Sequence, residues 1–223
     1  MGGALEVLWQ LAGNVRLYDI SVVTGPGTPE WPGDTPFSCG WTARIADGSS
    51  VNLTAVTSSP HVGTHADAPL HVTAGGAAAE ALPIDAFVGR ALVVSIAGVP
   101  RDVGAELIDR VPGGTVRLLL RTGASIATGT FPADWPAVTA PVATALANRG
   151  LRLLGVDAPS VDRRESKTLP VHHALFAGGA YILENLDLDG IADGSYELLA
   201  PPMRWAGVDA APVRALLRDV PSR

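Results

Sequence analysis

The chain of 223 residues is 47% hydrophobic and 17% charged, a composition typical of a folded globular protein rather than a disordered one. Its net charge of −6 and the scattering of its 16 basic residues argue against nucleic-acid binding. No apolar stretch reaches the roughly 18 residues of a membrane-spanning helix, so no membrane segment is predicted. The length is most simply that of one domain.

The N-terminus and the single cysteine indicate a cellular compartment. The first 14 residues contain a short apolar patch with no cationic start before it, so a signal peptide is not expected. Cys39 is the only cysteine, which excludes an internal disulfide and fits a reducing cytoplasm. We expect Cys39 to be a small buried residue, and the protein to be cytoplasmic.

Strands are predicted first at Leu17–Val23 and then, after a long loop, at several short apolar runs. Residues 24–40 carry four prolines and several glycines and are predicted to be an ordered loop of turns. The further predicted strands are Asn52–Thr57, Ala91–Ile96, Val116–Arg121, Leu151–Val156, Ala180–Leu183 and Tyr196–Ala200. Two of them, V-R-L-L-L-R and L-R-L-L-G-V, are nearly continuous apolar runs, which indicates central strands covered on both faces.

Three helices are predicted between and after these strands, at Asp102–Arg110, Ala140–Arg149 and Ala211–Arg218. The second has the clearest ends, because Thr139 can cap it, Pro141 suits its first turn and Gly150 can close it. Strands that alternate with helices predict an α/β fold with a mixed sheet.

The most informative segment is H-V-G-T-H-A-D-A-P-L-H, which brings His61, His65, Asp67 and His71 within eleven residues. Imidazole nitrogen and carboxylate oxygen are donors that bind Zn²⁺ or a similar divalent ion. A regular strand would separate His61 from His65 by about 13 Å, and Gly63 argues against a regular helix. A broken element, tightened at Gly63, fits better; chance clustering of surface or core histidines is the alternative.

Other parts of the chain could complete such a site. His61, His65 and Asp67 alone would make an open three-ligand site. The adjacent His172 and His173, and Glu184 at the end of an apolar strand, could add ligands for a second ion bridged by Asp67. His71 could then move protons. The alternative for Glu184 is a strand end in water. Likewise, Trp31 is either a cap on the core or an aromatic wall of a pocket.

Several motifs resemble the cyclase-like metal-dependent hydrolases, and within that family the kynurenine formamidases (arylformamidases). They are the histidine run, W-P-G-D-T-P-F at Trp31–Phe37, G-V-D-A-P-S-V-D at Gly155–Asp162, S-K-T-L-P-V-H-H at Ser166–His173 and I-L-E-N-L around Glu184. The similarity extends from Leu17 to the C-terminus. We therefore expect an N-terminal extension over residues 1–16 and a hydrolase domain over residues 17–223.

The resemblance implies a swivelling β/β/α fold, two zinc ions per subunit with Mn²⁺ or another divalent ion as the alternative, a small-molecule substrate and a homodimer or higher homo-oligomer. The roles that it implies are metal ligation by His61, His65, Asp67, His172 and Glu184, acid/base catalysis by His71 and substrate contact by Trp31. One departure from the family pattern is the basic pair Arg163 and Arg164 in the loop after Asp162.

The activity implied is hydrolysis of N-formyl-L-kynurenine to L-kynurenine and formate, in tryptophan degradation. A sister cyclic-amide hydrolase such as isatin hydrolase, or a non-catalytic metal- or ligand-binding protein on the same scaffold, is the alternative. A serine-hydrolase route to the same products is disfavoured, because the sequence contains no G-x-S-x-G elbow.

Overall fold

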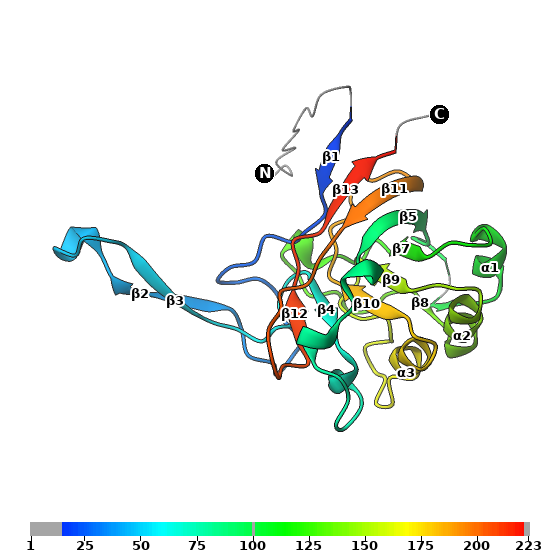
Figure 1. Ribbon diagram of the computed structural model, residues 1–223, viewed down its shortest axis with the longest axis horizontal. Coiled ribbons are helices and arrows are strands. Elements are labelled where there is room, and N and C mark those ends of the chain that lie inside the picture. Colours follow the sequence, from blue (N-terminus) through cyan, green and yellow to red (C-terminus); the bar gives the residue numbers. More distant parts are fainter. Residues whose placement is uncertain (1–14, 100, 221–223) are drawn as a thin grey trace.

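A nine-stranded mixed sheet forms the body of the molecule (Figure 1) in the computed structural model, which describes residues 15–99 and 101–220. The sheet order is β1 (Leu17–Asp19), β13 (Leu216–Asp219), β11 (Gly194–Leu199), β5 (Val88–Ser95), β7 (Arg117–Arg121), β9 (Leu153–Val156), β10 (Tyr181–Glu184), β4 (His65–Asp67) and β12 (Ala210–Pro212). The four central strands, β5, β7, β9 and β10, are parallel, and the strands on both sides pair antiparallel.

Three helices lie together on one face of this sheet: α1 (Glu106–Arg110), α2 (Ala140–Asn148) and α3 (Pro170–Ala177) (Figure 1). Strand β7 shows how both faces are covered. Leu118 and Leu120 pack with the helices, whereas Leu119 packs in a second buried cluster on the other face, as expected from the alternation of side chains along a strand. The predicted α/β class with a mixed sheet is confirmed.

Helix α2 begins after Thr139, as predicted, with Pro141 in its first turn. Thr139 caps it through its backbone alone, because its carbonyl oxygen accepts the Ala143 N–H at 3.0 Å and its side chain forms no capping hydrogen bond. Short 3-10 helices connect other elements, at Ile45–Asp47, Pro69–His71, Ala79–Ala81, Ile84–Ala86 and Ile126–Thr128.

Two small sheets lie outside the main one. Strands β6 (Asp102–Val103) and β8 (Ala137–Val138) form a short parallel pair. Strands β2 (Ser38–Ala43) and β3 (Leu53–Thr57) form an antiparallel hairpin that projects from the body as a long arm (Figure 1). Cys39 lies on this arm and is exposed, so the expectation of a buried cysteine is wrong, because β2 packs only against β3.

Several predicted element boundaries are wrong. The predicted helix Ala211–Arg218 is instead parts of strands β12 and β13. Val213, Ala215 and Leu217 are buried while the residues between them are more exposed, a period of two that belongs to a strand. Pairing with β4, β1 and β11 overrides the helical propensity of Ala and Leu. The predicted helix at Asp102 starts only at Glu106, because Asp102 and Val103 pair with β8.

The predicted extension over residues 1–16 lies, except for residues 15 and 16, outside the described residues, so the boundary at residue 17 stays a prediction. Among the described residues, no helix is long and apolar enough to span a bilayer.

Candidate active site

The histidine run folds as a broken element. The chain turns at Gly63, which has φ +78°, and a Cβ built there would lie 1.9 Å from Thr24 Oγ1. Asn185 holds this turn by donating its side-chain N–H to the Gly63 carbonyl oxygen at 3.2 Å. The run then enters β4, which is buried, and ends in the 3-10 helix Pro69–His71. The prediction of a broken element tightened at Gly63 is confirmed.

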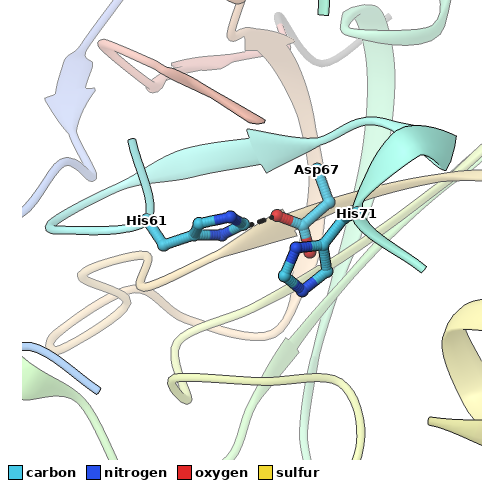
Figure 2. Close-up of side chains that lie close together, drawn as sticks. All are labelled: His61, Asp67 and His71. Atoms are coloured by element: carbon cyan, nitrogen blue, oxygen red, sulfur yellow. Dashed lines mark ion pairs between the residues drawn. The ribbon is translucent and has the colours of Figure 1, made fainter. Parts of the chain in front are cut away.

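This local structure brings His61 and His65 against Asp67. His61 Nδ1 and His65 Nε2 each lie 3.2 Å from Asp67 Oδ1, and 3.1 Å from one another. Figure 2 shows the His61 ring pointing at the Asp67 carboxylate, with the His71 ring beside it. Asp67 is fully buried, yet its Oδ1 accepts no hydrogen bond from the described residues. An orphaned buried carboxylate oxygen facing two imidazole nitrogens fits a cation site.

The second carboxylate oxygen of Asp67 faces helix α3. His172, on α3, has its Nε2 3.1 Å from Asp67 Oδ2 and 3.5 Å from Glu184 Oε1. The other oxygen of Glu184, Oε2, lies 3.6 Å from His65 Nε2. In both Asp67 and Glu184, one carboxylate oxygen faces His172 and the other faces the histidine run. The donor set offers one group of ligands around Asp67 Oδ1 and another around Asp67 Oδ2, and it fits one or two divalent ions.

Asp162 orients the His172 ring. Its carboxylate accepts hydrogen bonds from His172 Nδ1 at 2.7 Å and from the backbone N–H groups of Val171 and His172 at 3.0 Å. A carboxylate on one ring nitrogen fixes the tautomer and leaves the other nitrogen for a metal. His173 is exposed on the same helix, so it is His172 that lies in the cluster.

Asp209 connects His61 with His71 on the opposite side of the cluster. Its Oδ2 lies 3.0 Å from both His61 Nε2 and His71 Nδ1. Asp209 immediately precedes β12, which pairs with β4 so that Ala210 lies opposite Asp67. Asp209 could not be predicted for the site, because nothing in its local spacing connects it to a run of residues about 140 positions earlier. Asp162 belongs to the G-V-D-A-P-S-V-D motif, but no role was predicted for it.

The cluster is strongly coupled electrostatically. Burial lowers the pKa values of these three imidazoles, but the carboxylates close to their ring nitrogens outweigh it, raising the pKa of His61 to about 9 and those of His65 and His172 to about 10. Burial raises the pKa of Asp67, but the imidazoles of His172, His61 and His65 hold it well below its usual range. The hydrogen bond from His61 likewise lowers the pKa of Asp209. A site that binds protons this firmly offers the same lone pairs to a cation.

A pocket of about 810 Å³ opens above the cluster. His61, His65, His71 and His172 line its floor, and Trp31, Phe131, Arg164 and Lys167 are among its other lining residues. Trp31 meets Phe131 edge to face at 5.5 Å and the buried Trp135 at 6.0 Å between ring centroids. Trp31 therefore packs on the core and also lines the pocket as an aromatic wall.

The chain is similar to known proteins over most of its length. The model of the Cyclase family matches residues 18–163. A solved structure described as a potential metal-dependent hydrolase with cyclase activity is 28% identical, with a TM-score of 0.80 over 93% of this chain and 100% of the other. A protein from Bacillus stearothermophilus described as a predicted metal-dependent hydrolase is also 28% identical, with a TM-score of 0.79 and the same coverage.

Isatin hydrolase A from Labrenzia aggregata, solved with benzyl benzoate bound, is 23% identical, with a TM-score of 0.76 over 92% of this chain and 93% of the other. At this identity the likeness shows a shared fold and nothing further. Together with the two more similar structures, it supports the cyclase-like α/β fold that the sequence predicted.

Proposed function

Because the chain belongs to the Cyclase family, we propose that it is a metal-dependent hydrolase that converts N-formyl-L-kynurenine to L-kynurenine and formate. The observation that carries the hydrolase proposal is the orphaned Oδ1 of Asp67, buried between two imidazoles at the floor of an aromatic pocket. The descriptions of the two structures that are 28% identical support it, since both are called metal-dependent hydrolases.

The proposed metal ligands form two groups that share Asp67. His61, His65 and Asp67 would hold one divalent ion, and Asp67, His172 and Glu184 a second. Imidazole and carboxylate ligands suit zinc, and they suit manganese as well. When bound, such ions lower the pKa of a coordinated water toward neutrality and polarise the carbonyl group of an amide substrate.

His71 is the proposed acid/base. Its ring nitrogen Nδ1 is held by Asp209 at 3.0 Å, and its ring lines the pocket. During hydrolysis the water oxygen bonds to the formyl carbon and the carbon–nitrogen bond breaks. His71 takes the proton that the water loses and delivers it to the departing aromatic amine, which is a poor leaving group unless it is protonated.

The aromatic wall supports an aryl substrate. Trp31 is 37% exposed although it contacts the core, so one part of its indole remains available in the pocket. Phe131 meets it edge to face. An aryl ring that packs against these two side chains gains from burial and from ring–ring contact, which would fix the orientation of the scissile amide.

A second candidate activity is hydrolysis of a cyclic aryl amide such as isatin, which the fold likeness to isatin hydrolase supports. The same wall and cluster would serve a flat bicyclic lactam. Side-by-side assays of N-formylkynurenine and isatin separate the two, because the preferred substrate has the larger kcat/KM. A non-catalytic binding protein would retain metal and turn over neither.

The deciding experiment is metal removal with restoration. Dialysis against EDTA should abolish formamidase activity, and addition of Zn²⁺ or Mn²⁺ should restore it, with the ions per chain counted by elemental analysis. Activity that survives in protein shown to be metal-free would overturn the metal mechanism. Metal without turnover of either amide would overturn the proposal of an enzyme for these substrates.

A further inference from the structure

The loop from β9 to α3 carries two basic side chains into the pocket. Lys167 is the only lysine among the 223 residues, and it lines the pocket together with Arg164. Both side chains are exposed. The floor of the same pocket is made of imidazoles and carboxylates that contact one another. Among the described residues, neither cation forms an ion pair with the cluster, and the hydrolysis proposed above assigns no role to either of them.

Arg164 differs from its neighbour Arg163. Arg163 forms ion pairs with Asp102 and with Glu165, which lie outside the pocket lining. Within the described residues Arg164 forms no ion pair; its guanidinium lies over the Phe131 ring, 5.4 Å from the centroid, with one weak contact of 3.4 Å to the Ala133 carbonyl oxygen. Such stacking positions a guanidinium and leaves its N–H donors available.

The loop that presents Arg164 and Lys167 is held firmly at both ends. Asp162 accepts three hydrogen bonds from the start of α3, and its carbonyl oxygen accepts the Trp135 indole N–H at 2.8 Å. Ser166 Oγ accepts the Leu169 N–H at 3.1 Å. The backbone that carries the two cations is thus fixed relative to His172, which lowers the ordering cost of binding a ligand there.

No carboxylate that lines the pocket neutralises Arg164 or Lys167. Of the acidic residues that line the pocket, Glu184 and Asp209 are engaged by the histidines. The remaining one, Asp34, accepts the Thr35 N–H at 2.7 Å and forms no ion pair with either cation. A pocket with an aromatic wall, a hydrolytic floor and two such cations suits a ligand that combines an aryl group with an anion.

We propose that Arg164 and Lys167 form a carboxylate-binding subsite that makes the enzyme selective for aryl amides whose side chain ends in a carboxylate. This inference rests on the proposed function and specifies its substrate class. The aryl ring packs on Trp31 and Phe131, and the carboxylate accepts hydrogen bonds from the Arg164 guanidinium, which contacts the same phenyl ring. Lys167 adds a second positive charge. Neutral aryl amides enter the pocket without this contact.

The test compares two ligands that differ by one charge. L-Kynurenine carries the carboxylate, and its carboxamide derivative has an uncharged group of the same shape. Titration calorimetry on the metal-loaded protein should give a Kd for L-kynurenine about tenfold or more below that of the carboxamide, the usual worth of a hydrogen bond to a charged group. The ratio should shrink with added salt, because both cations are exposed.

Variants then assign the preference to these side chains. In the R164Q/K167Q double variant the Kd for L-kynurenine should rise until the two Kd values are about equal, because the carboxylate loses both positive charges. The matched control is R163Q, which removes the neighbouring guanidinium and should keep the preference. Thermal melting checks that each variant remains folded.

Two results would refute the carboxylate subsite. A wild-type protein that binds L-kynurenine no tighter than the carboxamide, or a preference that survives in the double variant, overturns the subsite. A separate assay with formanilide, a neutral aryl formamide, tests the proposed function alone. Hydrolysis of formanilide without a carboxylate preference would support the formamidase and refute the subsite. A carboxylate preference without any hydrolysis would support the subsite and refute the formamidase.

Discussion

One oxygen of Asp209, Oδ2, lies 3.0 Å from His61 Nε2 and 3.0 Å from His71 Nδ1. The same carboxylate oxygen therefore joins a proposed metal ligand to the proposed acid/base. The hydrogen bond from His61 lowers the pKa of Asp209, so this carboxylate is ionised at neutral pH. A buried or half-buried carboxylate that accepts from an imidazole fixes its tautomer and raises its basicity.

The first prediction is that Asp209→Asn reduces kcat by about 10- to 100-fold, the range found for groups that orient metal-site histidines. The amide keeps the shape of the carboxylate but removes its charge, so His61 and His71 lose the charged partner that orients their rings. The measurement is kcat with metal content determined on the same samples, together with the pH–rate profile. An unchanged profile with full activity would show that Asp209 is not a positioning residue.

The second prediction concerns His71. Its replacement by Ala should lower turnover by at least about 100-fold, the scale of lost general acid–base catalysis, while the metal content stays near that of the wild type. The competing role is metal ligation, because one ligand atom from each of His61, Asp67 and His71 lies within 4.8 Å of the others. Loss of one ion per chain in His71→Ala would make His71 a ligand instead.

The third prediction uses two adjacent histidines as a matched pair. His172 is 1% exposed and contacts Asp67 and Glu184, whereas His173 is exposed on the next position of α3. His172→Ala should lower the metal content and abolish activity, and His173→Ala should change neither by more than about twofold. Equal losses in both variants would indicate damage to α3 rather than removal of a ligand.

The core strands and the histidine cluster were predictable from the sequence because their signals are local. The run from His61 to His71 shows dense metal donors, and V-R-L-L-L-R shows a strand buried on both faces. Residues 211–218 misled the prediction because their Ala and Leu content favours a helix, and only pairing with distant strands decides otherwise.

The side chains that join the cluster from distant parts of the chain could not be predicted from local signals. Asp209 approaches His71 only through the pairing of β12 with β4, a long-range contact with no sequence spacing of its own. The choice of His172 over His173 likewise depends on the rotation of α3 against the sheet. The resemblance to a family named His172 for the site but gave no signal for Asp209.

The fourth prediction is that metal affinity rises with pH. In the metal-free protein the pKa of His61 is raised to about 9 and that of His172 to about 10, so both imidazoles carry protons at pH 7. A cation must displace these protons, and raising the pH removes them. The apparent affinity should therefore increase at least about tenfold per pH unit between pH 6 and 8. Competition with a chelator of known proton affinity measures it, and a pH-independent affinity would contradict the ligand assignment.

The fifth prediction is a homodimer formed through the β2–β3 hairpin. In its register Cys39 pairs with Val56 and Trp41 with Thr54, so these four side chains share one face of the ribbon. The other face carries the small residues Gly40 and Ala55, with Leu53 farther along β3. Trp41 and Val56 are each 57% exposed, and an isolated two-stranded ribbon is only marginally stable in water. Packing of this apolar face against a second copy would bury it.

Light scattering should give twice the chain mass of 22.9 kDa at micromolar concentration. Replacing Trp41 and Val56 by Ser should shift the protein toward monomer by removing apolar area from the contact. Ile84→Ser is the matched control, because Ile84 is 66% exposed but lies outside the hairpin. If the wild type stays monomeric at every concentration, or if Ile84→Ser dissociates the dimer as strongly as the hairpin variant does, the hairpin is not the interface.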